Sequence, residues 1–203
     1  MTYILLETGK STTSEAVFMK TLIESLGYDL SFNKIEFVNG YKNLEHVIPT
    51  IKARCAEGEE VIIIFDADSP NNHGGYEARK KEIEEVLSKN NVLAELFLFP
   101  NNKDDGDFET LLEHLIQKTK HSKMLDCYSD YEACLGEEYV HPNLKGKIFT
   151  YISAMKMSNS KRKRLDNGEW MFDNAEYWNL ESDYLIPLKD FLREHCSKED
   201  SRT

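Results

Sequence analysis

The sequence predicts an α/β protein with a Rossmann-like, mostly parallel four-stranded sheet and helices on both of its faces. Apolar, strand-like runs alternate four times with segments of helical periodicity, and this order is typical of a parallel sheet. In addition, the run at residues 61–65 is continuously apolar and largely β-branched. Such a run is typical of a strand that is buried on both faces.

The elements follow from these patterns in chain order. The expected strands cover residues 3–6, 33–38, 61–65 and 93–99. The second of them alternates apolar and polar residues, so we place it nearer an edge of the sheet. The expected helices lie at about residues 14–26, 44–55, 76–89 and 111–116. Pro49 is expected to interrupt the second helix, because proline lacks the backbone donor that a helix interior needs.

Strand signals stop near residue 120. We therefore expect an α/β domain at residues 1–120 and a mainly helical extension at 121–203 that packs on it. Helices are expected at 145–157 and 185–195. The residues expected to face inward from the first of these are Ile148, Phe149, Ile152 and Met155. A set of large aromatic residues is expected in the core rather than on a base-stacking surface: Trp170, Phe172, Tyr177 and Trp178.

Composition limits the classes of function. A net charge of −11 disfavours non-specific nucleic-acid binding, which depends on Lys and Arg, unless bases cluster or a metal intervenes. The one basic cluster, residues 161–164, has no interleaved aromatic residues, so a solvated loop is slightly favoured over a nucleic-acid contact.

No apolar run is long enough to cross a bilayer, and the N-terminal segment lacks a signal peptide's basic start. We expect a cytoplasmic protein without membrane contact, whose four cysteines are free thiols.

Carboxylates follow several of the expected strands. Glu7 follows the first strand, Asp66 and Asp68 follow the third, and Glu109 lies beyond the fourth. The carboxyl ends of parallel strands lie at one edge of a sheet, so these acids are expected on a common rim. Oxygen ligands of this kind suit Mg²⁺ or Mn²⁺. Taken alone, Asp66 and Asp68 fit a turn and a helix cap equally well.

These residues give the chain a resemblance to a known family. A strand ending in Glu7, followed by a helix and later by a hydrophobic strand ending in Asp66-Ala67-Asp68, resembles the Toprim domain over roughly residues 3–118. The run Phe99-Pro100-Asn101-Asn102, with Gly106 and Glu109, is similar to small, uncharacterised bacterial Toprim-related proteins. Nucleases of the overcoming-lysogenization-defect type are more distant relatives in this resemblance.

The resemblance implies a function and residue roles. Glu7, Asp66 and Asp68 would be the catalytic residues of a Mg-dependent, nuclease-like enzyme acting on DNA or RNA phosphodiesters. The metal would be held by these three residues together with Glu109. Lys10 and His73, in the loops that follow the first and third strands, are the expected substrate contacts. Nucleic acid and an ATPase or another protein are the expected partners.

The loop after Glu7 departs from the family pattern. Thr8 stands where the family has glycine, and the next acid is Glu15, so the loop is longer by a few residues. Together with the acidic net charge, this departure supports an alternative. In that alternative the chain is a non-catalytic Toprim-like module that binds a nucleotide or a protein partner.

Overall fold

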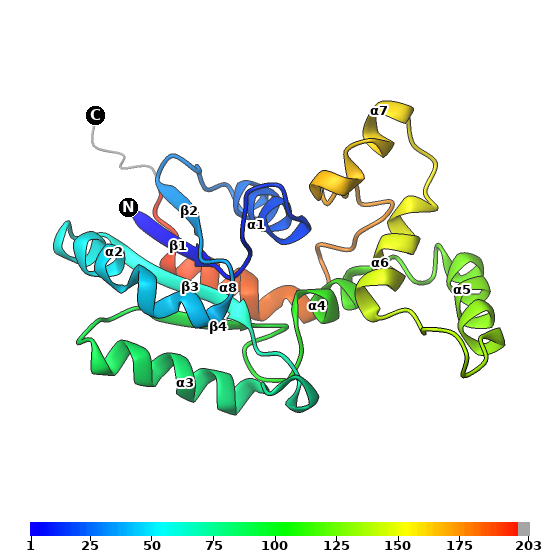
Figure 1. Ribbon diagram of the computed structural model, residues 1–203. Coiled ribbons are helices and arrows are strands. Elements are labelled where there is room, and N and C mark those ends of the chain that lie inside the picture. The colour runs from blue at the N-terminus through cyan, green and yellow to red at the C-terminus, as the bar shows by residue number, and fades with distance from the viewer. Residues whose placement is uncertain (199–203) are drawn as a thin grey trace.

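Four parallel strands form the centre of the protein (Figure 1). In the computed structural model, which describes residues 1–198, they are β1 (Thr2–Leu6), β2 (Asn33–Phe37), β3 (Glu60–Asp66) and β4 (Glu95–Phe99). Their order in the sheet is β2-β1-β3-β4, and every neighbouring pair is parallel. The predicted fold class is confirmed, and β2 lies at an edge as expected.

Each crossover of the sheet is made by a helix, and further helices follow the last strand. The helices are α1 (Ser14–Ser25), α2 (Leu44–Ala56), α3 (Tyr76–Lys89), α4 (Phe108–Leu115), α5 (Ser122–Cys134), α6 (Leu144–Ser153), α7 (Asn159–Arg162) and α8 (Ile186–His195). Short 3₁₀ turns lie at Tyr41–Asn43, Pro70–Asn72, Leu165–Asn167 and Asp183–Leu185. None of the helices described in residues 1–198 is both long and apolar enough to cross a bilayer.

Side chains of the central strands point alternately into two hydrophobic layers. Leu5, Ile63 and Phe65 pack with α2 and α3 on one face. Ile4, Ile62 and Ile64 pack on the other face with α1, α4 and α8. Strands covered on both sides must be apolar at nearly every position, which explains the continuous run in β3. The sheet therefore has helices on both faces, as the sequence predicted.

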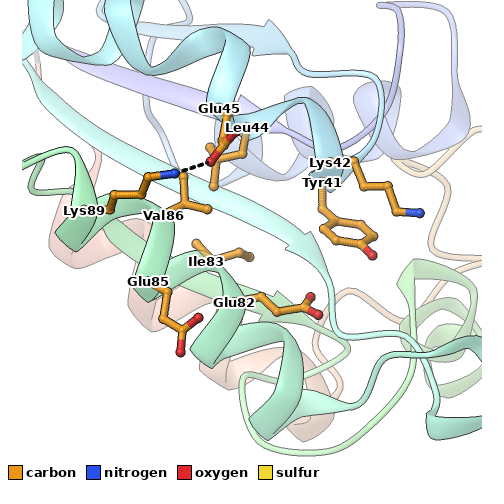
Figure 2. A pocket seen from close by; sticks show the side chains of 9 residues that line it. All are labelled: Tyr41, Lys42, Leu44, Glu45, Glu82, Ile83, Glu85, Val86 and Lys89. Carbon is orange, nitrogen blue, oxygen red and sulfur yellow. Dashed lines mark hydrogen bonds and ion pairs between the residues drawn. The ribbon is translucent and has the colours of Figure 1, made fainter.

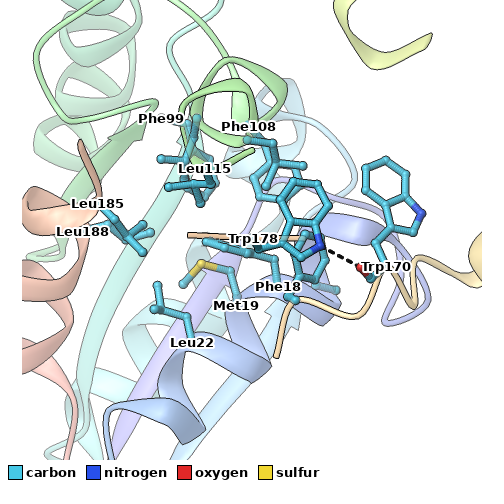
Figure 3. Close-up of a cluster of buried hydrophobic side chains, with 14 of the residues drawn as sticks. Phe18, Met19, Leu22, Phe99, Phe108, Leu115, Trp170, Trp178, Leu185 and Leu188 are labelled. Carbon is cyan, nitrogen blue, oxygen red and sulfur yellow. Dashed lines mark hydrogen bonds between the residues drawn. The ribbon is translucent and has the colours of Figure 1, made fainter. Parts of the chain in front are cut away.

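The helical extension adds to one of these two layers. Helices α5, α6 and α7 lie to one side of the sheet, near α4, and α8 returns to the sheet (Figure 1). Trp170, Phe172 and Trp178 are buried in the same cluster as Phe18 of α1 and Phe108 of α4 (Figure 3). Trp170, Phe172 and Trp178 were thus correctly predicted as core, whereas Tyr177 is only partly buried against the same cluster. The sheet and the extension share this hydrophobic layer, whereas the layer under α2 and α3 is formed without the extension.

The extension packs closely against the start of α1 at a glycine. Gly168 has φ +73°, and a Cβ at this position would collide with the backbone of Thr13 and Ser14. Glycine is required here both for the left-handed conformation and for the close approach. The extension is therefore docked against the loop that follows β1.

Two local predictions about the helices were wrong. Pro49 lies inside α2 and does not interrupt it. Proline has no amide hydrogen to donate to the Glu45 carbonyl, but both residues lie on the exposed side of the helix, so the loss is tolerated. Phe149 does not face inward and is 39% exposed, whereas Tyr151 is fully buried. The inward residues of α6 are Ile148, Tyr151 and Ile152, which are the i, i+3, i+4 positions of one helical face.

The prediction that all four cysteines are free was correct.

The two ends of the described chain meet at β1. The Thr2 hydroxyl donates to the His195 carbonyl at 2.7 Å and accepts from the Ser197 amide at 3.1 Å. The Ser197 amide also donates to Asn33 at the start of β2, at 2.8 Å. We call this set of contacts the terminal clasp. It connects the segment after α8 to the first two strands.

Candidate active site at the carboxyl edge of the sheet

Glu7 and Asp66 occupy the carboxyl ends of the two central strands. The two Glu7 oxygens accept hydrogen bonds from the Tyr41 amide at 3.1 Å and the Asp66 amide at 2.9 Å. Asp66 in turn accepts from the Phe108 amide, at the start of α4, at 2.8 Å. These two carboxylates therefore link four separate segments of the chain: the ends of β1 and β3, the segment at Tyr41 and the start of α4. Their positions are fixed by backbone donors, and this is the geometry expected of a preorganised site.

Glu15 joins these acids from the first turn of α1. It is buried, and its Oε1 atom has no hydrogen-bond partner. Burial, together with the charges of Glu7 and Glu109, raises the pKa of Glu15 to about 8, against smaller opposing effects of the Thr8 backbone and Lys145. A buried carboxyl group without a partner is costly, so this residue carries a proton at neutral pH or needs a cation.

The electrostatic environment of Asp66 shows that the acids converge. Burial raises the pKa of Asp66 well above its ordinary value, and the charges of Glu15, Glu7, Asp107 and Glu109 add to the effect. Burial likewise raises the pKa of Glu7, with a further contribution from the charge of Asp68. Acids that follow separate strands therefore act on one another at the carboxyl edge of the sheet. We call Glu7, Glu15, Asp66 and Glu109 the acid cluster.

Asp68 lies at the edge of this cluster and is paired with an arginine. Its Oδ2 atom is 2.7 Å from Nη2 of Arg79, a residue of α3 that is only 1% exposed. The guanidinium group stacks 3.2 Å from the centre of the Tyr41 ring and also pairs with Glu82 at 2.7 Å. Asp68 has φ +61°, a conformation that Asp tolerates. Arg79 thus neutralises the second aspartate of the Asp-Ala-Asp sequence.

Glu109 pairs with a lysine from the extension. Nζ of Lys145, in the first turn of α6, lies 2.9 Å from Oε1 of Glu109. Burial lowers the pKa of Lys145, but the hydrogen bond to Glu109 and the charges of Glu109, Asp66 and Asp107 outweigh it and raise the pKa overall. The acidic rim therefore includes a cation from outside the sheet.

The chemistry of the acid cluster suits a hard cation, although the cluster is not assembled as a coordination sphere. Carboxylate oxygens are the ligands that Mg²⁺ and Mn²⁺ prefer. The unpartnered Oε1 of buried Glu15 fits such an ion in its chemistry. Within residues 1–198, however, no three His, Cys, Asp or Glu side chains are placed closely enough to hold a metal. Binding would require side-chain rotations, including at Asp68, which is paired with Arg79.

The two residues expected to contact substrate lie outside this arrangement. Lys10 and His73 are both exposed. In the part of the chain that the structure describes, neither forms an ion pair or side-chain hydrogen bond with the acids. His73 has φ +56° and closes the short turn after β3. Asp104 and Asp105 take part in loop contacts: the Asp104 amide donates to Asn101 at 2.9 Å, and Asp105 accepts from the Tyr76 amide at the start of α3, at 2.7 Å.

Three residues of this region were absent from the predicted site: Glu15, Arg79 and Lys145. Glu15 precedes Phe18 by three positions and Leu22 by seven, so the sequence places a charge on the apolar stripe of its helix. Arg79 likewise shares a helical face with Ile83 and Leu87. A charged residue on a buried stripe is the signal that could have identified both. Lys145 carries no such signal, because its position depends on how α6 packs against α4.

A separate cavity of about 390 Å³ lies between α2 and α3 (Figure 2). Tyr41 forms part of its wall, and Lys89 crosses it to pair with Glu45 at 3.3 Å. Its lining includes none of the acid cluster. The cavity and the acid cluster are therefore distinct features.

Together these features define a parallel α/β protein with carboxylates gathered at the carboxyl edge of its sheet. The chain belongs to the family described as "Protein of unknown function (DUF3226)", whose profile matches residues 12–197. The match begins after β1 and Glu7, and it covers strands β2 to β4 together with the extension. No curated protein and no solved structure matches the chain.

Proposed function

We propose that this protein is a Mg-dependent phosphoryl-transfer enzyme of the Toprim type, nuclease-like, acting on DNA or RNA phosphodiesters. The observation that carries the proposal is buried Glu15, whose Oε1 has no partner, among Glu7, Asp66 and Glu109. Carboxylates at this density repel one another, and a divalent cation is the group that stabilises them best.

The residues have distinct roles in this proposal. Asp66 and Asp68 would hold the metal, with Glu109 and Glu15 available as further oxygen ligands. When bound, the metal would neutralise the substrate phosphate and stabilise the charge that develops on it. Glu7 would hold or transfer a proton: burial raises its pKa toward the range useful for general acid–base catalysis, and two backbone amides fix its carboxylate.

Asp66→Asn tests this assignment. Asparagine keeps one oxygen for the Phe108 amide, so the start of α4 is preserved while the negative charge is removed. We expect metal-dependent cleavage of a panel of DNA and RNA substrates to fall by about a hundredfold or more. Asp130→Asn, at an exposed position of α5, makes the same charge change as a control. Equal cleavage by Asp66→Asn and the wild-type protein would refute the assignment.

A second function is favoured by the ion pairs of the rim. Asp68 is neutralised by Arg79 and Glu109 by Lys145. Such internal pairing is what a non-catalytic module, binding a nucleotide or a protein partner, would need in order to fold without a metal. A magnesium titration separates the two functions. The enzyme should gain thermal stability from millimolar Mg²⁺, whereas the non-catalytic module should not.

A further inference from the structure

Two cations reach the carboxylates of the rim, and they differ in their access to solvent. Arg79 is 1% exposed, is stacked on Tyr41, and has both terminal nitrogens in ion pairs. The side chain of Lys145 is 67% exposed, and its only ion pair in the described structure is with Glu109. An incoming anion can therefore reach Lys145 but not Arg79. Arg79 is suited to a structural role and Lys145 to a contact with a ligand.

The position of Lys145 is fixed by the packing of the extension. Two residues further along the chain, Lys147 pairs with Glu113 of α4 at 2.6 Å, so two ion pairs hold α6 against α4. Asn143 is the N-cap of α6, and its side chain accepts from the Gly146 amide at 2.9 Å. Lys145 thus lies in a capped first turn on a docked helix. The long side chain can move while its backbone stays in place.

An acidic rim creates a problem for a phosphate-bearing substrate. The carboxylates that would attract a metal also repel a polyanion, and the chain as a whole has a net charge of −11. A metal ion offsets only part of the negative charge of four carboxylates. An accessible ammonium group beside the cluster supplies an additional attraction for the phosphate.

We propose that Lys145, contributed by the helical extension, is a substrate-binding residue that exchanges Glu109 for a phosphate group of the substrate. This inference rests on the proposed function, because it assumes a phosphate ester at the acid cluster. It also gives the extension a role in the site: the extension delivers the one exposed cation that pairs with an acid of the cluster in the described structure. Release of Glu109 would free its carboxylate for the metal.

The test compares Lys145→Ala with Lys147→Ala in the full-length protein. Lys147→Ala is the matched control, since it removes an ion pair between the same two helices away from the acid cluster. Two quantities are measured: Mn²⁺ binding without substrate, by electron paramagnetic resonance, and binding of a fluorescent single-stranded oligonucleotide across a salt series, with Ca²⁺ in place of Mg²⁺.

For Lys145→Ala we expect Mn²⁺ binding to be equal or tighter, because a competing cation has been removed. Oligonucleotide binding should weaken about tenfold to hundredfold. The slope of log affinity against log salt should become shallower by about 0.7–1, corresponding to one phosphate contact fewer. Lys145→Arg should restore most of the slope, and Lys147→Ala should leave it unchanged. If Lys145 had only a structural role, its replacement would not change the dependence of oligonucleotide affinity on salt.

The outcomes distinguish a failure of the inference about Lys145 from a failure of the proposed function. If the wild-type protein binds Mn²⁺ and the oligonucleotide, and Lys145→Ala has the same affinity and salt slope as Lys147→Ala, the inference about Lys145 is wrong while the proposed function stands. If the wild-type protein binds neither, the proposed function fails and the inference fails with it.

Discussion

The position of Glu15 has two opposing effects, one from its place in the first turn of α1 and one from its burial. As an acid in the first turn, it interacts favourably with the positive end of the α1 dipole. Its side chain is nevertheless buried beside other carboxylates, and its pKa is raised to about 8. Evolution commonly retains costly arrangements of this kind at functional sites. We therefore attribute the burial of Glu15 to function rather than to stability.

Glu15 should make the stability of the metal-free protein depend on pH. Its pKa is higher in the folded state than the ordinary value of 4.5, so the folded state holds a proton that the unfolded state releases. The free energy of unfolding should therefore fall as the pH rises from about 5 to 8, by at most about 1.4 kcal/mol per unit from this one group. Urea denaturation in EDTA at several pH values measures the slope.

In Glu15→Gln the slope over the same range should flatten, and the variant should be more stable than the wild-type protein at pH 8. Glu24→Gln makes the same charge change on the exposed side of α1 and should leave the slope unchanged. A Glu15→Gln variant whose stability declines as steeply as that of the wild-type protein would show that Glu15 is not the group responsible.

At the scale of elements, Arg79 connects the end of β3 to α3. The loop between them turns back so closely that a Cβ at Gly74 would collide with the Asp68 side chain and the Ala67 carbonyl. The Gly75 amide donates to Ala67 at 2.8 Å, and Arg79 pairs with Asp68. The loop after the Asp-Ala-Asp sequence is therefore fixed by contacts with the helix that follows it.

Arg79→Met should destabilise the protein by about 2–3 kcal/mol, because methionine fills the space but leaves Asp68 without its partner. Arg193→Met is the control, since Arg193 forms an exposed i,i+3 pair with Asp190 and should cost about 0.5 kcal/mol or less. Thermal or urea denaturation of both variants compares the two losses. Similar values for the two would show that the Arg79 pair contributes no more than a surface pair.

The elements were largely predictable, because their signals are local. Apolar runs identified β1, β3 and β4, alternation of apolar and polar residues identified β2, and helical periodicity identified α1, α3 and α4. The errors arose where packing or exposure decided the outcome: Pro49 is tolerated on an exposed face, and Phe149 is turned outward by the way α6 meets α4. Glu7, Asp66 and Glu109 were predictable as neighbours because strand ends share an edge. The ion pairs of Asp68 with Arg79 and of Glu109 with Lys145 were not predicted, because each depends on how a later helix packs.

At the scale of the whole molecule, the hydrophobic layer shared by the sheet and the extension predicts a single cooperative unit. The cluster on the α1 face joins Ile62 and Phe97 of the sheet with Tyr151, Trp178 and Leu188 of the extension. Removal of the extension would expose this face of the sheet to water, and burial of large apolar side chains is the main source of folding free energy. The family match over residues 12–197 likewise covers the two parts together.

We expect the full chain to unfold in one calorimetric transition and a fragment of residues 1–120 to fail to fold cooperatively. Differential scanning calorimetry and near-UV circular dichroism of both proteins provide the measurement. Two separate transitions in the full chain, or a fragment with a sharp transition of its own, would contradict the shared core and favour two independent domains.

The terminal clasp has a consequence for synthesis on the ribosome. The first strand made is central in the sheet, yet Thr2 receives its partners only when His195 and Ser197 have been translated. The α8 helix, which covers one face of the sheet, follows all four strands in the chain. Until residues 186–197 have been translated, this face of the sheet lacks part of its cover. A nascent chain at that stage is a natural client for chaperones that bind exposed hydrophobic segments.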